Sequence, residues 1–220
     1  MVAEIDMKFY SKILLLVFIF SSVSGDEKYE YFRKLVVQND YISLKKELSN
    51  NPKLKKSDLL LWAQNADMSE FLINQGFDPN TKGQHQNMTT LMESVRNGNL
   101  DQCKIYLSSN VSINAKDDAG RTALHYASGN LNLEIALLLI EKGAYIDAQD
   151  YEGETPMMRA VRDGDDELVY ALSEAGANKR LLNKDRLTVV ELVQFSTCED
   201  SKKTLVDTLT DEKGSRCKVP

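Results

Sequence analysis

A repeat of 33 residues dominates the sequence. Residues 120–127 (GRTALHYA) align with residues 153–160 (GETPMMRA), and residues 87–94 (NMTTLMES) stand one period earlier. The pair Gly143-Ala144 recurs as Gly176-Ala177, again 33 residues later. A fixed period of this length indicates a series of small units, in which each unit packs on its neighbours. The 220-residue chain is therefore expected to form a short repeat array.

Each period carries the signals for two helices. The threonine at the start of a period is able to cap a first helix by accepting backbone N–H bonds, and Pro156 fits the first helical position, where its missing N–H costs little. Gly143 and Gly176 suit the left-handed residue that ends a second helix. The leucines at 137–139 lie in one second helix, and all three are expected to be covered by neighbouring repeats. We expect helix pairs near residues 90–109, 123–142 and 156–175.

Three further segments complete the pattern: residues 113–115 (INA), 122–125 (TALH) and 146–148 (IDA). Together with the glycines they resemble the ankyrin repeat, whose pattern is G-x-T-P-L-H-x-A, a first helix, G-x-x-E, a second helix and G-A-x-x-N-A. The resemblance implies an all-α ankyrin-repeat solenoid of helix-turn-helix units, with about six repeats including degenerate caps. It assigns the repeat domain to residues 26–208, clear repeats to about 87–119, 120–152 and 153–185, and a C-terminal tail to 209–220.

The units at the two ends are degenerate, as expected of repeats that cap an array. The unit at residues 58–76 is compressed, because Ala63 and Gly76 are 13 positions apart where Ala127 and Gly143 are 16 apart. Near the C-terminus, Arg186 stands at a turn position where glycine is expected. The sequence therefore does not predict a regular turn there.

Near the N-terminus, an apolar run follows two lysines and precedes small residues. Residues 13–20 are ILLLVFIF, Lys8 and Lys12 precede them, and Ser21 to Gly25 follow. This order is typical of a secretory signal peptide, which we assign to residues 1–25 with cleavage after position 24 or 25. The alternative is an uncleaved membrane anchor, but the apolar stretch is shorter than the ~20 residues that span a bilayer. We expect an exported protein, periplasmic or secreted, that keeps no stable membrane anchor.

The sequence offers few groups for catalysis. His125 belongs to the T-x-L-H segment, and in the resembled family this histidine ties its turn to the neighbouring repeat; the alternative, a general base, has no serine or cysteine partner at a telling spacing. Metal-binding and phosphate-binding motifs are absent from the sequence, so we expect neither a metal nor a cofactor. Cys103 is expected in the core. Cys198 and Cys217 are expected to form a disulfide in an exported protein, the alternative being two free thiols.

The resemblance also implies where a partner binds. Ankyrin repeats hold other proteins along a concave face, formed by the turn fingertips and the exposed sides of the first helices, because these positions are free of stacking. In this sequence the positions are Glu93, Arg96, Asp118, Arg121, Tyr126, Tyr151, Glu152, Glu154, Arg159, Arg162 and Asp163. Tyr126, Tyr151, Arg159 and Arg162 are expected to form one cluster of anchors, since Tyr and Arg are enriched at binding hot spots. The alternative is that the two arginines pair with Asp163 or Glu154.

The net charge and the motifs absent from the sequence limit the classes of function that the chain can have. A formal net charge of −6 provides no general attraction to nucleic acid or to anionic lipid. An enzyme is disfavoured because no catalytic constellation exists. We expect a non-catalytic protein-protein binding module, a monomer that acts outside the cytoplasm. It would inhibit, or protect against, an envelope-acting enzyme; the alternative is a secreted effector of a symbiont or pathogen that binds a host protein.

Overall fold

The computed structural model describes residues 25–51, 58–83, 86–129, 132–195, 205–206 and 209. Its helices are α2 (Gly25–Val37), α3 (Tyr41–Asn50), the 3-10 helix η2 (Asp58–Trp62), α4 (Ala66–Asn74), α5 (Thr90–Arg96), α6 (Leu100–Ser108), α7 (Ala123–Gly129), α8 (Leu133–Glu141), α9 (Pro156–Asp163), α10 (Asp166–Glu174) and α11 (Val189–Phe195). These residues contain one isolated antiparallel bridge, Lys82 to Thr89, and no named strand. The predicted all-α fold is confirmed. Within the described part, no helix is long and apolar enough to cross a membrane.

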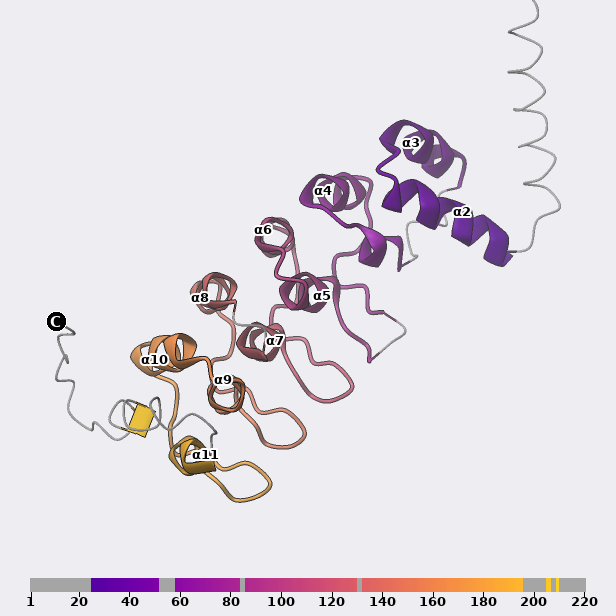
Figure 1. The fold of residues 1–220 in the computed structure, drawn as a ribbon. Coiled ribbons are helices and arrows are strands. Elements are labelled where there is room, and N and C mark those ends of the chain that lie inside the picture. The colour runs from indigo at the N-terminus through magenta and orange to yellow at the C-terminus, as the bar shows by residue number, and fades with distance from the viewer. Residues whose placement is uncertain are drawn as a thin grey trace, which may run out of the picture.

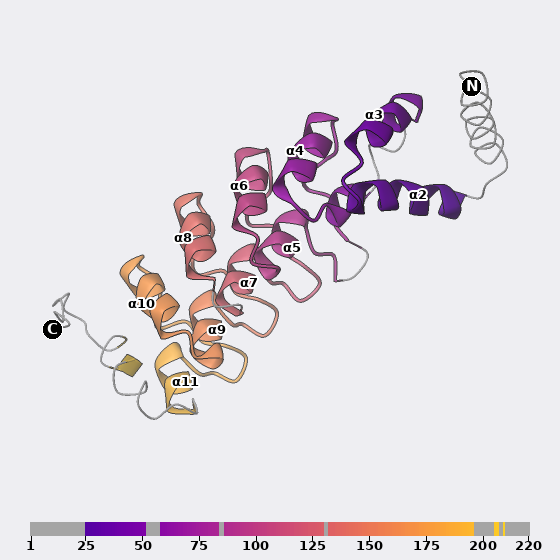
Figure 2. The same ribbon diagram turned by 45° about the horizontal axis from the view of Figure 1, so that its top comes forward.

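The helices lie in two rows (Figures 1 and 2). An outer row consists of α4, α6, α8 and α10. An inner row consists of η2, α5, α7, α9 and α11, and the connecting loops project beside it as fingers. Each central unit therefore contributes one inner helix, one outer helix and one finger, while α2 and α3 form the N-terminal end of the array.

Threonine caps and glycine ends define the helix pairs, as predicted. The hydroxyls of Thr89 and Thr155 each accept a hydrogen bond at 3.3 Å from the backbone N–H three residues later. Pro156 occupies the first turn of α9. Just after α8 and α10, Gly143 and Gly176 have φ values of 91° and 88°, the left-handed conformation that favours glycine. The observed pairs α5–α6, α7–α8 and α9–α10 agree with the three predicted pairs.

His125 connects two neighbouring repeats. Its Nδ1 accepts a hydrogen bond from the backbone N–H of Thr122 at 3.1 Å, so the proton of the neutral ring lies on Nε2. Nε2 donates to the backbone oxygen of Glu154, in the next repeat, at 3.0 Å. Burial lowers the pKa of His125 and thereby favours this neutral form. The structural role predicted for the histidine is confirmed.

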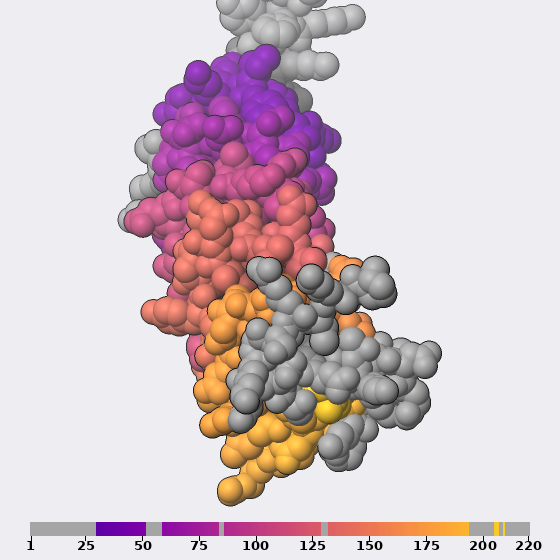
Figure 3. Space-filling model, turned by 90° about the vertical axis from the view of Figure 1, so that its left-hand side faces the viewer, coloured from indigo at the N-terminus to yellow at the C-terminus, as the bar shows by residue number. Residues whose placement is uncertain are grey.

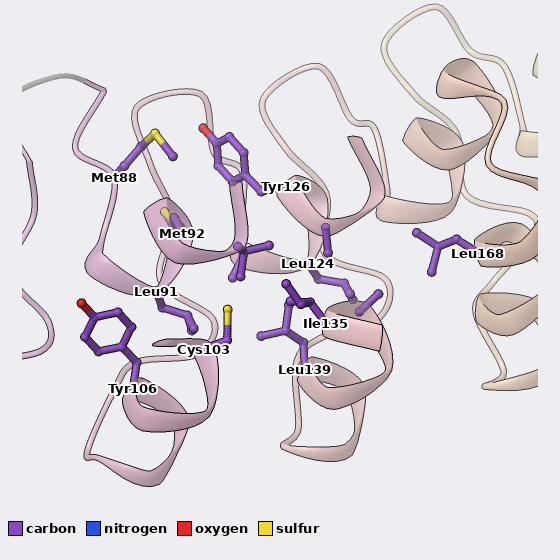
Figure 4. Close-up of a cluster of buried hydrophobic side chains, with 14 of the residues drawn as sticks. Met88, Leu91, Met92, Cys103, Tyr106, Leu124, Tyr126, Ile135, Leu139 and Leu168 are labelled. Atoms are coloured by element: carbon purple, nitrogen blue, oxygen red, sulfur yellow. The ribbon is translucent and has the colours of Figure 1, made fainter. Parts of the chain in front are cut away.

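Apolar side chains fill the space between the two rows (Figure 4). Leu91 and Leu124 extend from the inner helices, and Ile135 and Leu139 from α8, and all four are buried. Burying a leucine or isoleucine side chain contributes roughly 1.5–3 kcal/mol. Ala127 is also fully buried, which agrees with close approach of adjacent helices. The core therefore runs along the array, between successive units.

Of the three cysteines, only Cys103 lies among the described residues. Cys103 is free and fully buried, as predicted, with its Sγ 3.2 Å from Ser94 Oγ. Burial raises the pKa of its thiol, which keeps it protonated. Cys198 and Cys217 lie outside the described residues, so their disulfide stays a prediction.

The outer helix α8 does not bury all of its leucines. Leu139 is fully buried, whereas the side chain of Leu137 is 46% exposed. The prediction that neighbouring repeats cover all three leucines is therefore wrong for Leu137. The reason is helical geometry: two residues correspond to about 200° around the helix axis, so Leu137 and Leu139 point in nearly opposite directions.

The turn at Arg186 forms although glycine is missing. The Arg186 N–H donates to the oxygen of Asn183 at 2.9 Å, just as Gly153 donates to Asp150 at 3.0 Å. Arg186 adopts the same left-handed conformation, with a φ of 60° where Gly153 has 74°. At the other end, the predicted compression appears as the five-residue helix η2 in place of a full inner helix.

Candidate functional site

The fingers before α7, α9 and α11 are tight turns whose first residue is Asp117, Asp150 or Asn183. Asp117 Oδ1 accepts hydrogen bonds at 2.8 Å from the N–H groups of Ala119 and Arg121. One period later, Asp150 Oδ1 accepts from Glu152 and Glu154 at 2.9 Å. These local bonds replace water as partners of the turn amides. The tip residues are therefore held in a fixed conformation before any partner binds.

Adjacent fingers are joined by backbone hydrogen bonds at one repeated position. The N–H of Asp118 donates to Gln86 O at 2.9 Å, and that of Tyr151 donates to Ala119 O at 2.9 Å. The N–H of Lys184 donates to Glu152 O at 2.8 Å. This ladder sets Asp118, Tyr151 and Lys184 in one row along the array. Sequence reasoning missed Lys184, although its place 33 residues after Tyr151 is the signal that identifies it.

Tyr151 is exposed and yet fixed in position. Its side chain is 58% exposed. Its ring lies against Gly120, since a Cβ added at Gly120 would come within 2.5 Å of Tyr151 Cδ1. An aromatic side chain that is already ordered loses little entropy when a partner covers it. Tyr151 therefore has the properties expected of a binding anchor.

Tyr126 does not have the exposure predicted for it. Only 8% of it is exposed, and its hydroxyl donates to Asp117 Oδ2 at 2.5 Å. The Arg121 guanidinium covers the ring, 4.8 Å from its centroid. Burial, followed by the hydrogen bond to Asp117, raises the pKa of Tyr126 to about 12. The prediction of an exposed anchor is wrong because the hydroxyl bonds to the buried carboxylate of Asp117, in the finger that leads into α7.

Most charged residues of the predicted surface form ion pairs, either with one another or with residues outside the predicted set. Glu93 lies 2.7 Å from Arg96, and Glu152 lies 3.3 Å from Lys184. Arg121 Nε lies 3.1 Å from Asp117 Oδ2. The Glu93–Arg96 and Glu152–Lys184 pairs are exposed and contribute about 0–1 kcal/mol each, so a partner is able to replace them at little energetic cost. The Arg121–Asp117 pair is largely buried and belongs to the finger itself.

The two arginines of the predicted cluster behave differently. Arg162 Nε pairs with Glu154 Oε1 at 2.5 Å, which was the alternative interpretation of this residue. Arg159 forms no ion pair within 4.0 Å among the described residues, and it is half-buried. Asp163 is exposed as a residue, but its carboxyl is partly desolvated, which raises its pKa, and the charge of Arg159 opposes that shift. Asp118 accepts a hydrogen bond from Asn87 Nδ2 at 2.6 Å.

The described part of the chain contains no group of three or more His, Cys, Asp or Glu side chains that could hold a metal ion. Its one described histidine, His125, uses both ring nitrogens in the hydrogen bonds that join two repeats. The arrangement on the fingers and inner helices thus provides an ordered tyrosine, loosely paired charges and hydrogen-bonding groups, which suits recognition of another surface.

Comparisons with known proteins agree with this architecture. A family model described as ankyrin repeats (3 copies) matches residues 59–150 and residues 91–183, which together span more than half of the chain. Putative ankyrin repeat protein L271 of Acanthamoeba polyphaga mimivirus is 31% identical over 101 residues, covering 46% of this chain and 14% of the relative. The nuclear factor NF-kappa-B p105 subunit of Gallus gallus is 35% identical over 99 residues, covering 44% of this chain and 10% of the relative. Neurogenic locus notch homolog protein 1 of Homo sapiens is 33% identical over 76 residues, covering 34% and 3%. The chain thus matches only a small part of each of these relatives, and its match to the repeat model shows that it belongs to the ankyrin-repeat family, a family of non-catalytic protein-interaction modules.

Proposed function

We propose that this protein-binding module acts outside the cytoplasm and holds its partner against the fingers and inner helices. The observation that carries the proposed binding surface is Tyr151, which is 58% exposed and held by the finger ladder and by its contact with Gly120. Arg159, which has no ion pair among the described residues, supplies a charge that a partner is able to use. The partner we propose is an exported enzyme that acts on the cell envelope, and the chain inhibits it or shields its target as a monomer.

Export is supported by the sequence of residues 1–25. The apolar run at 13–20 and the small residues after it suit a cleaved leader. N-terminal sequencing of the native protein should find a first residue near Asp26. An intact leader on the native protein would contradict export by this route. Peptide mapping without reduction should find Cys198 linked to Cys217, because both would enter an oxidising compartment.

The binding surface is tested by one double variant. The native protein is cross-linked in the envelope fraction, and the partner is identified by mass spectrometry and purified. Changing Tyr151→Ala together with Arg159→Ala should weaken its binding by at least about tenfold in calorimetric titration, because loss of one hot-spot side chain alone typically costs ~2 kcal/mol. Circular dichroism should show an unchanged fold.

Tyr170→Ala is the matched control, since Tyr170 is 56% exposed but lies on the outer helix α10. If the double variant binds as tightly as wild type, the surface assigned here is not the one used. If cross-linking captures a host protein and no envelope enzyme, the effector alternative replaces the inhibitor.

A further inference from the structure

Two exposed apolar side chains lie on the outer row of helices, away from the fingers. Leu137 of α8 is 46% exposed and Tyr170 of α10 is 56% exposed. They are 33 residues apart and therefore occupy the same position in successive repeats. Packed helices lie roughly 8–10 Å apart, so the two side chains stand about that far from each other. Figure 3 shows the side of the molecule on which α8 (salmon) and α10 (orange) reach the surface.

Acidic residues border this pair on both sides. At the start of the two helices stand Glu134 and Glu167, and at their ends stand Glu141 and Glu174, again in matching positions. All four are exposed. Among the described residues only Glu141 has an ion pair, with Lys142 at 3.1 Å. The outer face of α8 and α10 is thus an apolar pair between two negative rows.

The rows at the two helix ends have different physical explanations. Glu134 and Glu167 stand in first turns, where the helix dipole favours negative charge. Glu141 and Glu174 stand in last turns, where the dipole disfavours it, and neither last turn contains a basic residue. The helix dipoles therefore do not account for Glu141 and Glu174, and only Glu141 is compensated, by Lys142, the residue that follows it. Glu174 has no ion pair among the described residues, so its charge is available to a positively charged partner.

We propose that this outer face, defined by Leu137, Tyr170 and the four glutamates, binds a basic amphipathic helix of another protein. A helix that crosses α8 and α10 presents residues i and i+7 about 10.5 Å apart, which matches the spacing of the two apolar side chains. The negative rows are separated by seven residues along each helix, or about 10.5 Å, close to the 10–12 Å diameter of one helix with its side chains. Lysines or arginines on both flanks of the bound helix would then meet a row each.

The negative charge of this outer face disfavours other kinds of ligand. Nucleic acid and anionic membrane surfaces are repelled by the four glutamates. The face is separate from the finger surface, so the inference does not rest on the function proposed above. Reciprocal tyrosine variants distinguish the two surfaces, because Tyr151 and Tyr170 have nearly equal exposure on different rows.

The test uses the full chain and a synthetic helical peptide of about 18 residues, with leucines seven positions apart and lysines on both flanks. Calorimetric titration should find saturable binding, and a peptide with glutamate in place of lysine should not bind. Leu137→Ala with Tyr170→Ala should weaken binding of the lysine peptide by at least about tenfold. Glu141→Gln with Glu174→Gln should weaken it at low salt and reduce its salt dependence.

Tyr151→Ala should leave the affinity for this peptide unchanged. Equal affinity for the lysine and glutamate peptides, or no saturable binding up to about 1 mM, overturns the proposal. The proposal is also overturned if sedimentation shows that the full chain forms a dimer and that the Leu137→Ala and Tyr170→Ala changes dissociate it. That result would assign the face to a second copy of the chain.

Discussion

The interface of α4 with α6 and the interface of α8 with α10 use the same repeat positions in opposite ways. Gln102 and Tyr106 of α6 occupy the positions that Leu168 and Leu172 occupy in α10, two periods later. All four side chains are buried. The first interface, termed here the polar interface, carries hydrogen bonds, whereas the second, the apolar interface, is filled by aliphatic groups.

A short network holds the polar interface together. Gln102 Nε2 donates to the backbone oxygen of Ala63 at 2.8 Å and to Ser69 Oγ at 2.9 Å. Ser69 Oγ also lies 3.0 Å from the hydroxyl of Tyr106. The reason lies in the compressed N-terminal unit. Because η2 is short, the chain just after it is irregular, and the carbonyl of Ala63 faces α6 instead of pairing within a full helix. An irregular unit can thus join a regular array when its buried polar groups are paired by the neighbour.

The largest effect is expected in the apolar interface. Leu168→Ala removes a fully buried leucine between α10 and its neighbours, and should lower the free energy of unfolding by about 2–5 kcal/mol. Chemical denaturation followed by circular dichroism measures this change. The control is Leu137→Ala, which should change it by less than about 0.5 kcal/mol beyond helix propensity because the side chain is half exposed. Equal losses in both variants would contradict the burial described here.

A transplant tests whether the polar interface needs its polarity. Gln102→Leu places at α6 the residue that position 168 has in α10. It should lower the free energy of unfolding by about 1–3 kcal/mol, since the carbonyl of Ala63 would stay buried without its donor. Denaturation under the same conditions gives the comparison with Leu168→Ala. A stabilised variant would show that the two interfaces are interchangeable.

The stability of the polar interface should depend on pH in the alkaline range, whereas that of the apolar interface should not. Burial raises the pKa of Tyr106 to about 12, whereas Leu172 at the matching position does not ionise. A tyrosine with a raised pKa contributes stability that is complete below its unfolded pKa near 10 and is lost as the pH rises toward 12. The loss should have a slope of up to about 1.4 kcal/mol per pH unit. Other tyrosines titrate as well, so the measured quantity is the free energy of unfolding of wild type minus that of Tyr106→Phe. This difference in stability should shrink from pH 10 to pH 12.

The sequence predicted the regular part of the array because its signals are local. A capping threonine such as Thr155, and a glycine such as Gly143, act within one turn of chain. The errors involve side-chain contacts that the repeat pattern does not encode. Tyr126 is buried because its hydroxyl bonds to Asp117, nine residues earlier in the finger that leads into α7, and the role of Gln102 depends on a carbonyl 39 residues away. A period of 33 residues identifies equivalent positions, but it does not say which neighbour each side chain meets.

The C-terminal end of the array is also irregular, because Arg186 stands there in place of a glycine. At Gly153, an added Cβ would lie 3.0 Å from Asn183 Cα, so the next finger packs directly on that glycine. Among the described residues no further finger follows Arg186, and its side chain is exposed. Arginine is therefore tolerated at position 186, although its left-handed φ of 60° costs roughly 1–2 kcal/mol.

The smallest effect is expected from Arg186→Gly. Relief of the left-handed conformation stabilises the folded state, while the greater freedom of glycine stabilises the unfolded chain by about 0.4–1 kcal/mol. The two terms largely cancel, and the free energy of unfolding should rise by no more than about 1 kcal/mol. Gly153→Ala is the matched comparison, and it should lower stability, because an alanine there meets both the unfavourable φ of 74° and the backbone of the next finger. If the Arg186→Gly variant is less stable than wild type, the arginine side chain must hold the turn through contacts of its own, and the C-terminal end would resemble the polar interface in compensating its irregularity.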